Sequence, residues 1–249
     1  MTAKWRSRLS TVKRLLKTCI GRDLFLGEQI AVRRERHGSD YGGWWIHPDP
    51  LGPQSIVYSF GVGDDITFDL RLIEKFGACV DAFDPTPRSI AWVRAQNLPV
   101  QFRFHPIGVA DFDGEEEFHP PPRENQMSYS IQAIHGAQSG SDSGTVHASV
   151  RRLSSIMGML GHDRIDLLKL NIEGAEYPVI RDLLASRIQL QQILVEFHHG
   201  HRGHTVRQTR DAVRSLNAAG YKIFCVSKNG RECSFLKTAA VQSADITRR

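Results

Sequence analysis

The chain has 249 residues, of which 41% are hydrophobic and 24% are charged, and these values are ordinary for a globular protein. No apolar run approaches the ~20 residues of a membrane-spanning helix, and the formal net charge of +5 is too modest to indicate nucleic acid as a partner. This length fits one large α/β domain or two small ones.

The first 20 residues predict a basic amphipathic helix. They carry lysine and arginine but no acidic residue, and apolar side chains recur at alternating spacings of four and three: Trp5, Leu9, Val12, Leu16 and Cys19. Such a helix fits a peripheral contact with anionic lipid or an acidic partner. It also fits a helix that docks on its own domain and exposes its charges to water. Lys13, Arg14 and Lys17 interrupt the apolar residues, which argues against a secretory signal.

The cysteines indicate a reducing compartment. The chain has four cysteines, which lie far apart without any C-x-x-C spacing: Cys19, Cys79, Cys225 and Cys233. This pattern predicts neither a zinc site nor a disulfide framework, so we expect a cytoplasmic location.

Residues 37–54 are rich in glycine and proline and are expected to be irregular. Trp44 and Trp45 lie within them, where they fit either a cover over a ligand or a plug at the edge of the core. We therefore divide the chain into a lead-in over residues 1–54 and a main domain over residues 55–240.

The main domain is organised around a glycine turn. Residues 55–60 form a β-branched and aromatic run of strand length, Gly61 and Gly63 follow it, and residues 65–76 have helical periodicity. Asp64 and Asp65 can cap this helix. A strand, a glycine turn and a helix N-terminus let the backbone approach a ligand closely. A tight turn without a ligand is the alternative.

The next apolar run ends in Asp84, 23 residues after Gly61. An acidic residue about 20 residues beyond the glycine turn, at the tip of the second strand, holds the ribose hydroxyls in such folds. The third position of a G-x-G-x-x-G fingerprint is Ile66, which weakens the case for a dinucleotide. The turn instead suits a ligand that is not anionic there, such as S-adenosylmethionine.

The middle of the chain predicts a short helix over residues 88–96 and a third strand over 100–107. Asp111 follows the third strand, where it could hold an adenine amino group or merely begin a turn, and Asp113-Gly114 predicts a β-hairpin. Residues 119–145 form a long polar loop, which we expect to help select the substrate.

A second polar cluster follows a predicted buried strand over residues 165–170. Asn171, Glu173 and Glu176 come at its end, before a helix predicted over residues 175–184. Ligands bind outside the carboxyl ends of parallel strands, so this cluster would face the same crevice as Gly61. Glu176 fits equally an ordinary acid at a helix N-terminus.

Glu196 and His198 end a further predicted strand. A glutamate in an apolar strand needs a partner, and we expect it to orient His198 as a general base, with Glu173 as the rival base. Asn171, Glu173, Glu196 and His198 are metal ligands by type. Their spacing matches no tight motif, so a divalent metal is not predicted.

The last elements are a helix over residues 205–219 and strands over 221–227 and 232–237, joined at Asn229-Gly230. We therefore expect an α/β fold with a Rossmann-like, mostly parallel seven-stranded sheet. It has helices on both faces, a C-terminal antiparallel hairpin and an N-terminal helical extension.

Several segments are similar to the FkbM-type family of class I S-adenosylmethionine-dependent methyltransferases. The most specific is Leu168-Lys-Leu-Asn-Ile-Glu-Gly-Ala-Glu176, and the resemblance covers about residues 50–237. It implies methyl transfer from S-adenosylmethionine, with a hydroxyl of a sugar, glycan or secondary metabolite as acceptor. It also implies that the cofactor is bound by Gly61, Gly63, Asp84 and Asp111.

Two residues depart from the family pattern: Ser59 replaces an acid of the first motif, and Asn171 replaces an aspartate. They keep open a catalytically weak or inactive binding module that acts through its basic N-terminus. An NAD(P)-linked oxidoreductase is a further alternative, against which the absent third glycine counts.

Overall fold

The computed structural model describes Thr18, residues 23–120, Tyr129, residues 145–200, residues 203–238 and residues 247–248. The predicted basic helix, apart from Thr18, and most of the predicted loop at 119–145 lie outside these residues. None of the helices in this part of the chain has the length and apolar character needed to cross a bilayer.

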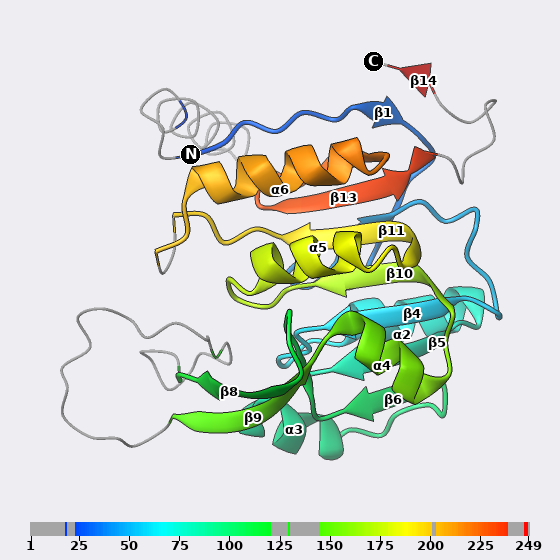
Figure 1. Cartoon of the computed structure of the whole chain (residues 1–249). Helices are drawn as coiled ribbons and strands as arrows, with labels where there is room; N and C mark the ends of the chain where they lie inside the picture. The colour runs from blue at the N-terminus through cyan, green and yellow to red at the C-terminus, as the bar shows by residue number, and fades with distance from the viewer. Residues whose placement is uncertain are drawn as a thin grey trace, which may run out of the picture.

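A seven-stranded sheet runs through the molecule in the order β6-β5-β4-β10-β11-β13-β12 (Figure 1). Its strands are β4 (Ile56–Phe60), β5 (Cys79–Phe83), β6 (Phe102–His105), β10 (Arg164–Leu170), β11 (Gln189–Glu196), β12 (Tyr221–Val226) and β13 (Glu232–Lys237). Strand β13 is antiparallel to both of its neighbours, and the other pairs are parallel. The sheet and the C-terminal hairpin are as predicted.

Helices cover both faces of this sheet, as expected. They are α2 (Thr67–Phe76), α3 (Pro87–Arg94), α4 (Leu153–Leu160), α5 (Glu176–Ala185) and α6 (Val206–Ala218). Side chains of α4, α5 and α6 share one hydrophobic core with Tyr58 and Phe60, whereas those of α2 and α3 share a second core with Val57. Figure 1 shows α5 and α6 in front of the sheet and α2 behind it. Side chains that alternate along β4 thus pack into both cores.

Strand β10 lies in the centre because it is apolar on both sides. Ile165, Leu167, Leu168 and Leu170 are each 0% exposed, which is typical of a parallel strand covered on both faces. Full burial of each such side chain contributes about 1.5–3 kcal/mol to folding. The carboxyl ends of β4 and β10 are therefore held rigidly beside each other.

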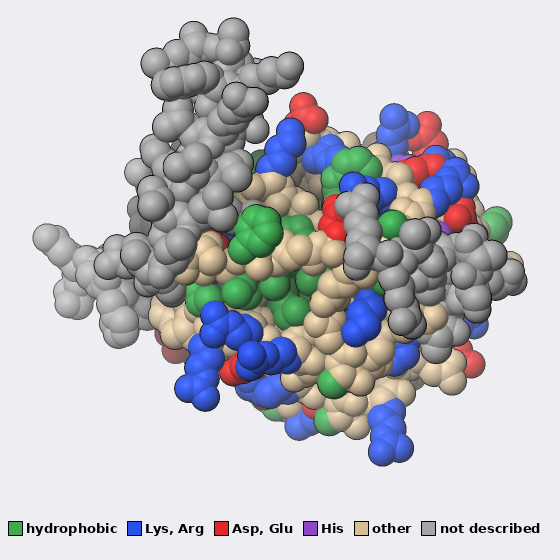
Figure 2. Space-filling view, turned by 90° about the horizontal axis from the view of Figure 1, so that it is seen from above, with side chains coloured by type: hydrophobic (Ala, Val, Ile, Leu, Met, Phe, Trp, Pro, Cys, Tyr) green, Lys and Arg blue, Asp and Glu red, His purple; other side chains and the backbone are tan. Residues whose placement is uncertain are grey.

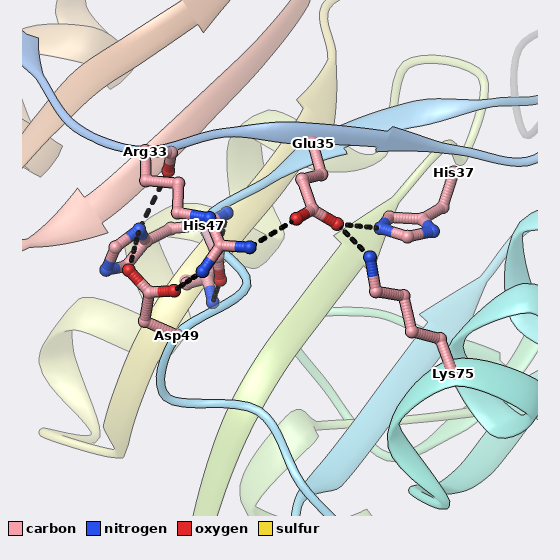
Figure 3. Close-up of polar contacts among 7 residues, drawn as sticks. Arg33, Glu35, His37, His47, Asp49 and Lys75 are labelled. Carbon is pink, nitrogen blue, oxygen red and sulfur yellow. Dashed lines mark hydrogen bonds and ion pairs between the residues drawn. The ribbon is translucent and has the colours of Figure 1, made fainter.

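Residues 37–54, expected to be irregular, include half of a short hairpin of β2 (Glu35–His37) and β3 (Trp44–Ile46). Glu35 joins Arg33 to Lys75 on α2, as Figure 3 shows. The buried amide of Gln192 on β11 exchanges two hydrogen bonds with the backbone of His47, at 2.9 and 2.8 Å. The hairpin is thus fixed to both α2 and the sheet.

The residues before this hairpin cover the β12 edge of the sheet. Gln29 exchanges two hydrogen bonds with the backbone of Ile223, at 2.7 and 2.8 Å, and Arg34 donates one to the carbonyl of Phe224 at 3.0 Å. A covered edge cannot pair with another chain. Figure 2 looks down on this side, where hydrophobic side chains lie in a hollow bordered by lysine and arginine.

The hairpin predicted at Asp113-Gly114 is wrong. Strands β7 (Gly108–Val109) and β8 (Gly114–Phe118) do not pair, because β9 (Val146–Arg151) lies between them. Asp113 instead holds the start of α4, where its carboxylate accepts hydrogen bonds from the Arg152 amide at 2.8 Å and the Ser155 hydroxyl at 2.7 Å. A short outer strand, β1 (Ile30–Ala31), pairs with β14 (Thr247–Arg248).

Candidate active site

A cavity of about 800 Å³ opens at the carboxyl ends of β4, β5, β10 and β11. All the predicted cofactor and catalytic residues line it: Gly61, Gly63, Asp84, Asp111, Glu173, Glu196 and His198. The structure thus brings together in space residues that are 137 positions apart between Gly61 and His198. Their roles stay predictions at this point.

The glycine turn passes close to the end of β10. Gly61 has φ +80°, and a Cβ atom there would lie 1.8 Å from the carbonyl oxygen of Asn171. The Gly63 amide donates a hydrogen bond to Asp84 Oδ2 at 3.1 Å. Only glycine tolerates both the left-handed φ and this close approach of two backbones. The turn is therefore shaped as a bare backbone wall of the cavity.

Asp84 is held firmly at the tip of β5. Its Oδ1 accepts hydrogen bonds from the Thr86 amide at 3.0 Å and the Thr86 hydroxyl at 2.6 Å, and the residue is 6% exposed. Hydrogen bonds to a carboxylate compensate for its burial. Because Oδ2 faces the glycine turn, the acid is preorganised beside that wall.

Lys169 stabilises the glycine turn by hydrogen bonds. It is 3% exposed, and its ammonium donates to the Gly61 carbonyl at 3.2 Å and to Ser59 Oγ at 3.4 Å. The Asp69 carboxyl on α2 is 0% exposed, and burial raises its pKa against the opposing charge of Lys169. The Asp69 carboxyl thus lies near Ser59, where the family pattern has an acid, but it is not part of the cavity lining.

Asn171 presents an unused acceptor at the cavity. Its Oδ1 atom is buried and has no hydrogen-bond partner within the described residues, and the residue lines the cavity. A buried polar atom without a partner costs about 1–3 kcal/mol. The cavity wall therefore carries an acceptor that a donor on a bound ligand would satisfy.

His198 is held by Glu176, and the expected orientation by Glu196 is corrected. Glu176 Oε1 accepts a hydrogen bond from the His198 amide at 2.7 Å and lies 3.2 Å from the ring Nδ1. Glu196 ends strand β11, and no hydrogen bond joins it to His198 among the described contacts. The carboxylate hydrogen-bonded to the ring is thus that of Glu176, whereas Glu196 acts on His198 through its charge.

Three acids nevertheless surround His198. Burial is the largest influence on its pKa and lowers it, but the hydrogen bond and charge of Glu176, with the charges of Glu173 and Glu196, raise the pKa overall. Glu173 Oε1 lies 3.8 Å from Nε2. Glu173 has φ 51°, a conformation that is strained for a non-glycine residue and that clusters at functional sites.

Aromatic side chains form the remaining walls. Trp44 is 4% exposed and lines the cavity while packing in the core, whereas Trp45 packs beneath the Arg34 guanidinium at 5.4 Å. Trp44 thus packs in the core beside the cavity, and a role as a cover over a ligand stays a prediction. Tyr41 lines the mouth, and Ser39 ties its turn to Asp65 by a 2.5 Å hydrogen bond.

A family comparison agrees with this architecture. The profile of the methyltransferase FkbM domain matches residues 28–223.

The chain belongs to the FkbM methyltransferase family.

Curated relatives are similar but longer. The chain is 27% identical over 148 residues to a probable methyltransferase-like protein 24 of Homo sapiens, covering 58% of this chain and 33% of that protein. It is 26% identical over 188 residues to the protein of the same name from Rattus norvegicus, covering 71% and 44%. The chain therefore spans less than half the length of these relatives. No solved structure matches it.

The FkbM match begins at residue 28, upstream of the expected limit near residue 50. It therefore includes the β2–β3 hairpin, whose Trp44 and Tyr41 reach the cavity. Sequence reasoning also missed Asp69 and Arg231 near or at the cavity. Asp69 occupies the apolar face of α2 beside Phe68 and Leu72, and that position was the signal available in the sequence.

Proposed function

We propose that this FkbM methyltransferase transfers a methyl group from S-adenosylmethionine to a hydroxyl oxygen of a sugar, glycan or secondary metabolite. The observation that carries the proposal is the shared cavity, in which a bare glycine turn with Asp84 faces a buried histidine. One half suits a nucleoside, and the other suits proton transfer from an acceptor.

The residues present fit the cofactor. Gly61 and Gly63 both line the cavity, and a Cβ atom at Gly63 would enter open space, so no side chain at these two positions keeps a ligand away from the backbone. Asp84 offers Oδ2 toward ribose hydroxyls, and the partnerless Oδ1 of Asn171 can accept from the cofactor's ammonium. Asp111 lines the same cavity in the bend that follows β7, where we propose that it holds the adenine amino group.

The bound cofactor supplies an electrophilic methyl group on a sulfonium. The protein positions the acceptor oxygen for in-line attack, which can contribute several kcal/mol. His198 accepts the hydroxyl proton at Nε2, and general-base help of this kind is worth about 10²–10⁴-fold. Glu173, 3.8 Å from Nε2, orients the acceptor or receives the proton next.

Titration of S-adenosylmethionine and S-adenosylhomocysteine by calorimetry tests the cofactor site. We expect micromolar binding by the wild-type chain and about 10–100-fold weaker binding by Asp84→Asn, because a charge-assisted hydrogen bond is worth about 1.5–3 kcal/mol. Asp163→Asn is the matched control, since the Asp163 side chain is 91% exposed. If the wild-type chain binds the cofactor, hydroxylated acceptors are then screened for methylation by mass spectrometry.

A second candidate is a catalytically weak or inactive binding module. It is favoured by Asn171, which places an amide where the family pattern has a carboxylate. Folded wild-type protein that binds neither nucleotide would contradict the methyltransferase proposal and favour this module. In that case the working hypothesis is that the protein acts through contact of the basic residues 1–20 with an anionic surface.

Two further expectations stay proposals drawn from the sequence. The cysteine pattern supports a cytoplasmic location. The acceptor is expected to be a small molecule or glycan, without nucleic acid as a partner. Among the described residues, no group of three or more His, Cys, Asp and Glu side chains is arranged to hold a metal ion.

A further inference from the structure

One carboxylate connects the two catalytic strand ends. Glu176 lies in the first turn of α5 and is 0% exposed. Its Oε1 faces the amide and the Nδ1 atom of His198, at 2.7 and 3.2 Å, and its Oε2 accepts a hydrogen bond from the Gly174 amide at 2.8 Å. A carboxylate at a helix N-terminus is stabilised by the helix dipole. The Glu176 carboxylate also contacts residues outside α5, namely Gly174 before the helix and His198 after β11.

We infer that Glu176 is the positioning residue of the site: it holds the His198 proton on Nδ1 and directs the unprotonated Nε2 toward the acceptor. The inference rests on the proposed function, in which His198 takes the acceptor's proton.

The proton position follows from hydrogen-bond chemistry. A carboxylate only accepts hydrogen bonds, so the ring nitrogen facing Glu176 Oε1 must be the one that carries the hydrogen. The other tautomer would direct the Nδ1 lone pair at a carboxylate oxygen. With Nδ1 protonated, Nε2 keeps its lone pair on the side where Glu173 and the cavity lie.

Glu176 also secures the strained turn that carries Glu173. Glu173 and Gly174 both have positive φ, 51° and 107°, and a Cβ atom at Gly174 would lie 2.1 Å from His204 Nε2. The hydrogen bond from the Gly174 amide fixes this turn to the same carboxylate that fixes His198. Strained conformations persist only where surrounding contacts impose them.

The electrostatic surroundings of His198 come from three elements. Glu176 faces it from α5, Glu173 from the turn after β10, and Glu196 from the end of β11, where Arg231 in turn faces Glu196. All three acids favour the protonated ring, and Glu176 contributes the most among them. Removal of the Glu176 charge should therefore leave a less basic His198.

Long-range ¹H–¹⁵N NMR of the uniformly labelled full chain tests this without an acceptor. The His198 ring signals are assigned by their loss in His198→Asn. In the wild type above its pKa, we expect the proton on Nδ1. In Glu176→Gln, we expect a mixture of tautomers and a lower His198 pKa. Asp182→Asn makes the same carboxylate-to-amide change on the same helix, away from the cavity, and should leave both unchanged.

A wild-type ring protonated on Nε2 would overturn the inference, as would an unchanged tautomer and pKa in Glu176→Gln. If that variant fails to fold, the wild-type tautomer decides alone. Once an acceptor is known, Glu176→Gln should lower kcat by about 10²-fold with KM little changed, and the acid limb of the profile should move to lower pH. Nucleotide titration tests the proposed function separately, so either can fail alone.

Discussion

Gly61 and Gly63 share a turn and a left-handed backbone, but a methyl group would meet different surroundings at the two positions. At Gly61, with φ +80°, the added carbon meets the Asn171 carbonyl at 1.8 Å. At Gly63, with φ +59°, nothing lies within 4 Å. The two glycines therefore separate the cost of backbone conformation from the cost of a collision.

We expect Gly63→Ala to lower the free energy of unfolding by about 1–2 kcal/mol, the ordinary cost of an L-residue in this conformation. Gly61→Ala should cost more than that, because β4 and β10 must move apart, and it should also abolish nucleotide binding. Urea denaturation with calorimetric titration measures both effects. Equal losses of stability in the two variants would contradict the close approach seen at Gly61.

The residues of the cavity were predictable from strand ends, but their pairing was not. Glu196 lies two positions from His198 in sequence, yet the partner is Glu176, which reaches the histidine from α5. Parallel strands place their carboxyl ends at one edge whatever the loops do. Which side chains then touch depends on the turn after β10, whose positive φ at Glu173 no periodicity reveals.

At the scale of the element, helix α6 begins with a reciprocal cap. Thr205 Oγ1 accepts a hydrogen bond from the Gln208 amide at 3.3 Å, and Gln208 Oε1 accepts one from the Thr205 amide at 2.7 Å. This capping box satisfies two donors that the helix would leave without partners. It also ends the connection that follows β11 and His198.

Thr205→Ala should lower the free energy of unfolding by about 1 kcal/mol, measured by urea denaturation. Arg210→Ala, at an exposed position in the middle of the same helix, is the control and should change it by less than about 0.5 kcal/mol. A cap variant as stable as this control would mean that the first turn of α6 is held by packing alone.

Elements with strong periodicity were predicted well, whereas pairings across long connections were not. Strands β12 and β13 pair through the Asn229-Gly230 turn as the local signal requires. Asp113-Gly114 carries a similar signal, but β9 arrives from beyond the long polar loop and takes the place beside β8. A local turn preference is weak beside five cross-strand pairs, and nothing in the local pattern announces a distant strand.

At the scale of the whole molecule, one acid pair, on β11 and β13, links stability to pH. Glu196 and Glu232 are partners in register. Burial raises the pKa of each carboxyl, and the charge of Glu196 raises that of Glu232 further. A carboxyl whose pKa is raised on folding stabilises the folded state when it is protonated. This contribution to the free energy of unfolding is complete below the unfolded-state pKa of about 4.3, and it is lost as pH rises through the folded-state pKa.

We therefore expect Glu232→Gln to raise the melting temperature at pH 8 and to leave it nearly unchanged at about pH 3, where the Glu232 carboxyl is protonated in both the folded and the unfolded state. Differential scanning calorimetry across this range measures the difference. Glu74→Gln, on the exposed side of α2, is the control and should show no such pH-dependent gain. A gain of equal size at both pH values would mean that packing, not charge, limits stability there.

Strand β13 lies between β11 and β12, although the chain makes it after both. During synthesis, the edge of β11 therefore has no partner until residues 232–237 have left the ribosome, and β12 cannot join the sheet before them. An exposed strand edge in a partly made chain invites aggregation. Strand β13, the last strand of the seven-stranded sheet to be made, thus sets the moment at which that sheet is complete, and pauses in translation before it would prolong the vulnerable state.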